Sequence, residues 1–320
     1  MELIVSSARI RMLGAATAAL SVGLLAACSS STSTTSSDDS SKALDGVSVT
    51  VGSKDFTENI LLGQILAQAL TAEGADVTDQ TDLGGTSVNR EALLAGEIDV
   101  YPDYNGTGWT VHLGQQAPGQ DPQALYDDVA EMDLAENQIQ WVGRSPFNDT
   151  YGFAANGDLA ETEGAFDLQS MADYLEANPD ATLCLETEFP DRPDGLILFS
   201  DATGYTVPQD QIQILDTGLV YTETANGACQ FGEVYTTDGR ITALNLTLVD
   251  DPGVFILYNA SYTWNDALYQ ENADLYTRLA DEIFAPLDAA KMAELNAKVD
   301  IDGGKAEDVA ADYLKEIGLL

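Results

Sequence analysis

The sequence predicts an α/β protein with a mostly parallel sheet and two lobes. Three strand patterns and two helix patterns alternate within about 60 residues near the start of the folded part, which is the rhythm of an α/β unit. The 320 residues are 45% apolar, enough for a substantial core. Residues 45–320 contain no repeat array and no disordered linker, so two lobes joined by extended crossovers fit better than two separate domains.

The first strand and helix follow from alternation and then from helical spacing. In "VSVTVG" valines alternate with polar residues and the run ends at a glycine, which predicts a strand leading into a loop. Asp55 and Thr57, close to Glu58, signal the start of a helix. The apolar face of that helix comprises Ile60, Leu61, Leu62, Ile65, Leu66, Ala69 and Leu70.

A second strand, a second helix and a third strand come next. "ADVTDQTDLGG" predicts a strand that runs into a turn, and Thr86 or Ser87 can cap the helix through "VNREALLAGE". Gly96 lies near the C-terminal end of this helix, as glycine often does. "IDVY" predicts a short strand. Ligands of such sheets bind beyond the carboxyl ends of the strands, where "GSKDF" and "YPDYNGT" both lie.

The middle of the chain repeats this alternation less regularly, and the end is helical. Residues 138–155 are expected to be extended, and "FDLQSMADYLEANP" to be a helix that ends at Pro179. The later expected segments are a buried strand at 181–187, a short helix at 192–200, a strand with a turn at 234–241, a strand at 245–251 and helices over 265–320.

The charge of the chain excludes one class of partner. With 53 acidic against 13 basic residues, the formal charge is -40, which would repel a nucleic-acid backbone. We therefore expect no nucleic-acid binding. The acidic excess is compatible with a cationic ligand, but a generally acidic, salt-adapted proteome would give the same balance.

The N-terminus predicts export and a lipid anchor. Arg9 and Arg11 precede a short apolar run that ends in "LAAC", which resembles a bacterial lipobox with Cys28 as the acylated residue. Residues 1–27 would then be a lipoprotein signal peptide, and residues 28–44, rich in Ser and Thr, a tether. The expected location is extracytoplasmic, with acyl chains such as palmitate holding the protein at the cell membrane. A plain signal peptide is the alternative.

The two remaining cysteines, Cys184 and Cys229, leave two alternatives. Export would bring them into an oxidising compartment, where they can form a disulfide. Two buried free thiols are equally compatible with the sequence.

The sequence contains few residues that could support catalysis. His112 is the only histidine and has no nucleophile motif near it, so a histidine-based hydrolase would depend on it alone. A zinc site has too few His and Cys ligands, and neither a Walker-type loop nor a G-x-G-x-x-G motif is present. We therefore expect a binding protein, not an enzyme, with no metal and no cofactor.

Five stretches carry a resemblance to a known family: "VGSKDFTENILLGQILAQAL", "LGGTSVNREALLAGEIDVYPDYNGT", "FPDRPDG", "VYTTDGRI" and "LVDDPGVFILYNAS". From about Val47 to the C-terminus the chain resembles ABC-importer binding proteins for glycine betaine, choline and related osmoprotectants (the OpuAC or ProX-like class). The resemblance implies a type II periplasmic-binding fold, with one lobe from 45–149 and 254–320 and the other from 150–253. It also implies delivery of the ligand to a membrane permease driven by an ATPase.

The resemblance implies a tyrosine cage for a quaternary ammonium ligand. A trimethylammonium group has a positive charge but no N–H donor, so aromatic faces bind it where hydrogen bonds cannot, at about 0.5 to 2 kcal/mol per ring. Motif matching places the cage on Tyr104, Tyr151, Tyr235 and Tyr258, and places Thr107 at the polar tail of the ligand.

Two cations are expected to bind a ligand carboxylate. The resemblance assigns Lys54 and Arg192 to this role, and choline would leave both buried and unmatched. We therefore expect glycine betaine or proline betaine, with choline or carnitine as the alternative within the class. From other classes, a sensory domain and a secreted hydrolase stay open. Asp103 and Asn105 depart from the family pattern, and the sequence assigns them no role.

Overall fold

The computed structural model describes residues 42–116 and 121–320. The predicted signal peptide, Cys28 and all but the last residues of the tether lie outside these ranges. Within them, every helix is too short or too polar to span a bilayer.

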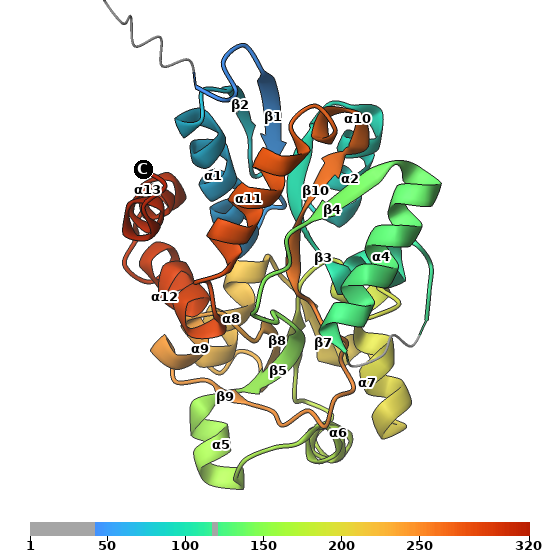
Figure 1. Ribbon diagram of the computed structural model, residues 1–320. Helices are drawn as coiled ribbons and strands as arrows, with labels where there is room; N and C mark the ends of the chain where they lie inside the picture. Colours follow the sequence, from blue (N-terminus) through green and yellow to red (C-terminus); the bar gives the residue numbers. More distant parts are fainter. Residues whose placement is uncertain (1–41, 117–120) are drawn as a thin grey trace, which may run out of the picture. The chain divides into compact units, whose positions relative to one another are not determined.

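The first sheet combines the start of the folded chain with a segment near its end. β1 runs parallel to β2 and β3, and β10 inserts antiparallel between β3 and β4, as the orange strand among blue and green ones in Figure 1 shows. In spatial order the strands are β2 (Asp76–Gln80), β1 (Ser48–Gly52), β3 (Val100–Tyr104), β10 (Ala260–Asn265) and β4 (Ile139–Val142).

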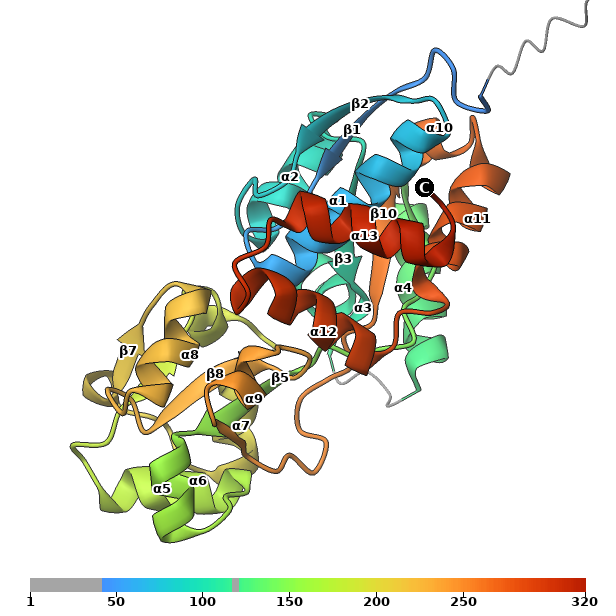
Figure 2. The same cartoon turned by 90° about the vertical axis from the view of Figure 1, so that its left-hand side faces the viewer.

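Helices from both ends of the chain pack around this sheet. The apolar face of α1 packs against α11, α12 and α13, while α2 packs against β3 and β10, and α4 against β4. Figure 2 shows α13 lying beside α1. The bounds are α1 (Thr57–Ala72), α2 (Thr86–Ala95), α3 (Asn105–Thr107), the π-helix η1 (Gly108–His112), α4 (Pro122–Asn137), α10 (Asp266–Tyr269), α11 (Ala273–Phe284), α12 (Ala289–Asp300) and α13 (Ala306–Ile317).

The second sheet is formed by the middle of the chain. β6 runs parallel to β7 and β8, and β5 runs antiparallel to β8 and β9. In spatial order its strands are β7 (Ile212–Ile214), β6 (Leu183–Leu185), β8 (Phe231–Tyr235), β5 (Tyr151–Ala155) and β9 (Thr247–Leu248). The helices around it are α5 (Gly157–Glu163), α6 (Leu168–Ala177), the 3-10 turn η2 (Phe189–Asp191), α7 (Leu196–Thr203), the 3-10 turn η3 (Gln209–Gln211), α8 (Thr217–Ala225) and α9 (Arg240–Ala243).

The parts of the chain built around the two sheets are called the first and the second lobe below. The chain passes between the sheets in two connections, from β4 to β5 and from β9 to β10. The expected lobe boundaries, at 149/150 and 253/254, fall within these connections and remain a proposal. In the second lobe Cys184 and Cys229 form a disulfide with an S–S distance of 2.00 Å, one of the two alternatives that the sequence left open.

The predicted α/β class is confirmed, but the sheets are less parallel than expected. Within the described chain each sheet has two parallel and two antiparallel strand pairings. The antiparallel pairings arise where the chain enters or returns to a sheet through a connection between the lobes. The strand β10 was missed because five of its six residues are buried, so its sequence shows no alternation.

The predicted start of α1 near Thr57 is confirmed, but the N-cap predicted for α2 was wrong, and several elements were missed. The N-cap residues are Phe56 for α1 and Gly85 for α2, and neither helix has a side-chain cap of its own. Gly96 does end α2, in the left-handed conformation with φ of 71°. The sequence reading also missed β7, α4, α5 and α8.

Candidate ligand-binding site

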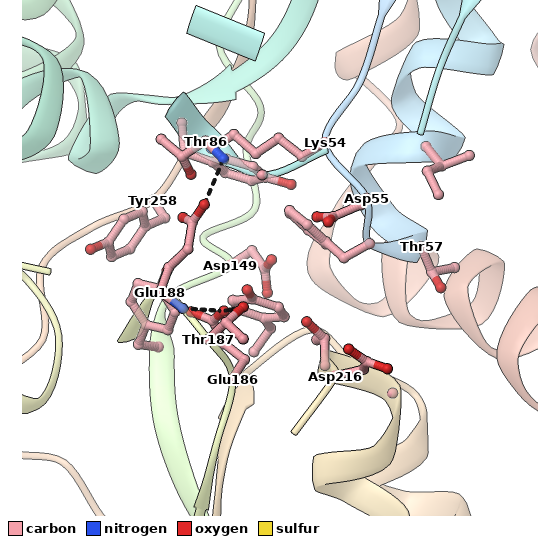
Figure 3. A pocket seen from close by; sticks show the side chains of 18 of the residues that line it. Lys54, Asp55, Thr57, Thr86, Asp149, Glu186, Thr187, Glu188, Asp216 and Tyr258 are labelled. Atoms are coloured by element: carbon pink, nitrogen blue, oxygen red, sulfur yellow. Dashed lines mark hydrogen bonds between the residues drawn. The ribbon is translucent and has the colours of Figure 1, made fainter. Parts of the chain in front are cut away.

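A cavity of about 510 Å³ lies between the two lobes. Its walls include the residues that follow β1, β3 and β6, so the carboxyl ends of parallel strands do meet at this cavity. Of the sequence-predicted ligand residues, the cavity is lined by Lys54, Tyr104, Thr107, Tyr151, Tyr235 and Tyr258. Figure 3 shows the polar side chains that surround it. The remaining predicted residue, Arg192, is buried directly behind the wall.

Five aromatic rings form a continuous belt on the cavity wall, and we call them the aromatic belt. Centroid distances along it are 6.1 Å from Tyr104 to Phe56, 5.0 Å from Phe56 to Tyr235, 5.4 Å from Tyr235 to Tyr151 and 5.2 Å from Tyr151 to Tyr258. The belt thus brings the four predicted tyrosines together. Rings from both lobes contribute to it.

Phe56 is the member of the belt that the sequence reading missed. Its ring lines the cavity and touches Tyr104 of the first lobe and Tyr235 of the second. The available signal was its place: an aromatic residue at the N-cap of α1, in the loop that follows β1, where polar residues are favoured.

Lys54 is neutralised within the first lobe. Its Nζ lies 2.8 Å from Oδ1 of Asp103, and 5.4 Å from the ring centroid of Tyr104. Oδ2 of Asp103 lies 2.7 Å from Nε2 of His112 and accepts a hydrogen bond of 2.6 Å from Tyr101. Burial alone would raise the pKa of Asp103, but Lys54 and His112 hold it well below its ordinary value. Asp103 is therefore ionised and matches the charge of Lys54.

Arg192 is paired in a similar way in the second lobe. Its Nε and Nη2 donate to the carboxylate of Asp194, both at 2.8 Å, and its guanidinium carbon lies 5.4 Å from the ring centroid of Tyr151. Burial would raise the pKa of Asp194, but Arg192 lowers it below its ordinary value. Nη2 also donates to Oγ1 of Thr107 across the lobe boundary, at 3.2 Å.

These pairs correct the physical argument against choline. The sequence reading assumed that Lys54 and Arg192 would stand unmatched in the absence of a ligand carboxylate. Asp103 and Asp194 instead supply the counter-charges from within the protein. A ligand without a carboxylate would therefore leave no uncompensated cation at either position, and discrimination between betaines and choline needs another source.

Two carboxyl pairs adjoin the cavity, and neither forms an ion pair with a basic side chain in the part of the chain that the structure describes. Oε2 of Glu58 accepts from the hydroxyl of Thr237 at 2.7 Å and from Asn296 at 3.1 Å, and the backbone N–H of Thr237 donates to Oδ1 of Asp149 at 3.2 Å. Burial raises the pKa of Glu58; burial and the proximity of Glu58 raise that of Asp149 well above its ordinary value. The two groups hold protons at higher pH than free carboxyls do.

The second carboxyl pair lies in the second lobe. The backbone N–H of Glu186 donates to Oε2 of Glu233 at 2.9 Å. Burial raises the pKa of both groups, and for Glu233 the neighbouring Glu186 adds to the effect. Glu186 also lines the cavity, so the second lobe places a carboxyl group in the same cavity as the aromatic belt.

The two departures from the family pattern have structural roles. Asp103 is the counter-ion of Lys54, as described above. The side-chain oxygen of Asn105 accepts from the backbone N–H of Asn259 at 2.8 Å, and the N–H of Asn105 donates to the carbonyl of Asn259 at 3.1 Å. Asn105 thereby ties the end of β3 to the segment that carries Tyr258. The ring of Tyr258 lines the cavity, and the hydroxyl of Tyr258 donates to Asp194 at 2.6 Å.

The lobes touch along two margins of the cavity. On one margin Glu188, Arg192 and Asp194 of the second lobe bond to the threonines Thr86, Thr107 and Thr110 of the first. On the other, Thr237 bonds to Glu58, and Arg240 lies 3.5 Å from Asp300. The cavity is therefore bounded by both lobes, which are linked by polar contacts at its edges.

Two sheets, two connections and a cavity between the lobes define the class of substrate-binding proteins with a periplasmic-binding fold. Residues 47–316 match the family described as the substrate-binding domain of an ABC-type glycine betaine transport system. This match spans most of the chain, and the chain belongs to that family.

Individual relatives agree with this assignment. The chain is similar to the glycine betaine-binding protein YehZ of Escherichia coli, with 34% identity over 84% of this chain and 90% of the relative. It is also similar to a glycine-betaine-binding protein of Pseudomonas aeruginosa, with 36% identity over 85% and 89%. Among solved structures, apo YehZ from Escherichia coli gives a TM-score of 0.61 at 33% identity, covering 85% of this chain and 99% of that one. The family and the fold expected from the sequence motifs are confirmed.

Proposed function

We propose that the protein captures glycine betaine in the cavity between its lobes and delivers it to an ABC permease. The observation that carries the proposal is the aromatic belt, which presents five adjoining rings to the cavity. Each ring face attracts a quaternary ammonium by about 0.5 to 2 kcal/mol, and more when water is excluded. The names of two relatives with more than 30% identity support this ligand.

The charges around the belt support a cationic ligand. Lys54 and Arg192 are each paired with an aspartate, so neither leaves an excess positive charge beside the rings. The cavity wall also contains Asp55, Glu186 and Asp216. A trimethylammonium group therefore meets aromatic faces against a background that is negative on balance.

The polar end of the ligand would lie near Thr107 and the guanidinium of Arg192. Thr107 lines the cavity and already bonds to Arg192. Choline or carnitine in place of glycine betaine is the alternative within the same importer class. A periplasmic-type sensor without transport uses the same capture step and differs only in the membrane partner.

Calorimetric titration tests the ligand. The mature protein is titrated separately with glycine betaine, proline betaine, choline and carnitine, and tyrosine and tryptophan fluorescence provides a second signal. We expect saturable binding of glycine betaine, with choline binding more weakly. Choline binding at least tenfold tighter than glycine betaine would overturn the choice of ligand, and no response to any of the four would overturn the cage.

The location is a second part of the proposal. We propose that the protein is held at the outer face of the membrane by lipid on Cys28, after removal of residues 1–27. Mass spectrometry of the protein extracted from membranes should then show an acylated N-terminal cysteine. A Cys28→Ala variant should appear in the soluble exported fraction; if it stays with the membrane, the anchor is elsewhere.

A further inference from the structure

The protein itself places a carboxylate at the margin of the cavity, the side chain of Glu188. This residue belongs to the loop between β6 and η2 of the second lobe and lines the cavity. Its Oε1 accepts a hydrogen bond of 2.8 Å from the backbone N–H of Thr86, which is the first residue of α2 in the first lobe. Figure 3 shows this side chain spanning the distance between the two lobes next to Tyr258.

The other oxygen of Glu188 faces Arg192. Oε2 accepts from Nη1 of Arg192 at 3.4 Å, and the same Nη1 donates to Oγ1 of Thr86 at 3.3 Å. Nη2 of this guanidinium donates to Oγ1 of Thr107, which also lines the cavity. Glu188 therefore accepts hydrogen bonds from the guanidinium of Arg192 and from the backbone N–H of Thr86, the two donors beside the position proposed for the polar end of the ligand.

The local backbone is shaped to admit this carboxylate. The position that a Cβ atom would take at Gly85 lies only 2.2 Å from Oε1 of Glu188, so any larger residue would displace the glutamate. α2 has no side-chain cap of its own, and Glu188 supplies the acceptor for its first amide from the opposite lobe. Glu188 nevertheless keeps 34% of its side chain exposed, so it can move away into solvent.

We propose that Glu188 is a specificity-determining residue that disfavours ligands with a carboxylate. Arg192 adjoins Tyr151, with 5.4 Å from its guanidinium carbon to the ring centroid, so an ammonium on the belt places a short carboxylate tail close to Glu188. Two carboxylates repel each other there, and the tail of a betaine must displace Glu188 from Thr86 and Arg192. Choline carries a hydroxyl and leaves the glutamate in place.

This inference rests on the proposed function, and its readout is a ratio of affinities. The dissociation constants of glycine betaine and choline are measured by calorimetry for the wild type, Glu188→Gln and Glu188→Asp. The glutamine removes the charge, and the aspartate keeps it but is one methylene too short to span the same distance. We expect the ratio of the choline to the glycine betaine dissociation constant to rise at least tenfold in Glu188→Gln, and to rise in Glu188→Asp by a smaller factor.

Asp216→Asn is the matched control. Asp216 is another acid of the same lobe that lines the cavity, and its side chain makes no hydrogen bond to the first lobe within the described residues. Its loss should weaken both cationic ligands by a similar factor and leave the ratio unchanged. Thermal melting verifies that each variant is folded.

Three outcomes are decisive. A tenfold rise of the ratio in Glu188→Gln, absent from Asp216→Asn, supports the inference. A ratio within threefold of the wild type in both Glu188 variants overturns it while the proposed function stands, since Glu188 would then be only a contact between the lobes. Failure of the wild type to bind either compound overturns the proposed function itself, and the inference with it.

Discussion

Each lobe contributes one wall of the cavity, called the first and the second wall after the lobes. The two walls contain the same kinds of residue, but the charged residues of the second wall also bond to the opposite lobe. Each wall has a tyrosine with a protein cation 5.4 Å from its ring centroid, Lys54 at Tyr104 and Arg192 at Tyr151. Each cation has an aspartate as its counter-ion, and each wall is adjoined by a carboxyl pair whose pKa values are raised.

The two walls differ in whether their cation also bonds to the opposite lobe. Lys54 and Asp103 form a pair wholly inside the first lobe. Arg192, by contrast, also bonds to Thr86 and Thr107 across the boundary. The cation of the first wall is thus neutralised within its own lobe, whereas the cation of the second wall also bonds to the other lobe. Substitutions in the first wall should mainly change stability, and those in the second wall or at the margins should mainly change affinity.

The largest expected effect breaks the ion pair of the first wall. Lys54→Met removes the ion-pair partner of the buried Asp103 and leaves its contact with His112, and removing one partner of a buried pair costs about 3 to 5 kcal/mol. We expect the melting temperature at pH 7.5 to fall by about 6 °C or more. Differential scanning calorimetry of the ligand-free protein measures this.

The pH dependence of this effect has a definite sign. Because the folded state lowers the pKa of Asp103, the stability that this carboxylate contributes is present above the pKa of the unfolded chain, about 4, and is lost as pH falls. The difference between wild type and Lys54→Met should therefore narrow towards acid pH. Lys291→Met, which removes a lysine that forms ion pairs with two exposed glutamates at the surface, is the control and should change the melting temperature by less than about 2 °C. An equally small effect of Lys54→Met would contradict the account of the first wall.

The next largest effect is on affinity and comes from the second wall. Tyr151→Leu removes the ring that joins Tyr235 to Tyr258 in the belt, and we expect glycine betaine to bind at least tenfold more weakly, corresponding to about 1.4 kcal/mol. Tyr151→Phe keeps the ring face, so calorimetry should give a dissociation constant within about threefold of the wild type. If the two variants bind equally weakly, the hydroxyl and not the ring face is responsible.

A substitution at the margin tests closure directly. A Cβ atom at Gly239 of the second lobe would lie 2.8 Å from Cβ of Ala297 and 3.0 Å from the carbonyl oxygen of Ala293, both in α12. Gly239→Ala should therefore hold the lobes apart at this edge and weaken ligand binding by about fivefold, about 1 kcal/mol of overpacking.

The control for this variant lies in the same lobe. At Gly152 an added Cβ would meet its nearest neighbour at 3.4 Å, an ordinary contact distance. Gly152→Ala should leave the affinity unchanged within about twofold. Small-angle scattering with and without glycine betaine should show less compaction for Gly239→Ala than for the wild type; full compaction would contradict the contact.

The smallest effect concerns the carboxyl pair of the first wall. Burial and Glu58 raise the pKa of Asp149, so the folded state binds more protons than the unfolded chain, and stability falls as pH rises above about 4. Asp149→Asn keeps an acceptor for Thr237 and removes the charge. We expect it to raise the melting temperature at pH 7.5 by about 2 to 4 °C, and much less at pH 4.

An exposed acid provides the comparison for this prediction. Asp128→Asn in α4 removes the same charge from the surface and should leave the melting temperature unchanged at both pH values. A destabilised Asp149→Asn at pH 7.5 would show that the ionised carboxylate is required there, contrary to the raised pKa.

The motifs predicted much of this site because its parts follow strand ends. Tyr104 is the last residue of β3 and Lys54 lies two residues beyond β1, so their meeting at one edge could be expected from the α/β rhythm alone. The counter-ions could not be expected in the same way. Asp103 and Asp194 are two of 53 acidic residues, and nothing in a list of acids tells which ones the fold buries beside a cation.

The missed residues share a physical cause. Phe56 and Glu188 act across the lobe boundary, and a contact of this kind depends on the relative position of two sheets, which periodicity does not encode. The strand β10 was missed for the opposite reason, since complete burial removes the alternation that marks a strand. Local patterns thus predicted many of the elements and the family resemblance predicted the four tyrosines, while the partners of the charged groups required the assembled fold.

The two connections between the lobes carry side chains of the cavity wall itself. Tyr258 lies between β9 and β10, and Asp149 lies between β4 and β5. If the lobes rotate about the two connections, atoms near the connections move little and atoms far from them move a long way. A ligand held against Tyr258 and Asp149 would therefore act close to the axis of this rotation. A displacement of a fraction of an ångström there would then become a far larger displacement at the outer ends of the lobes.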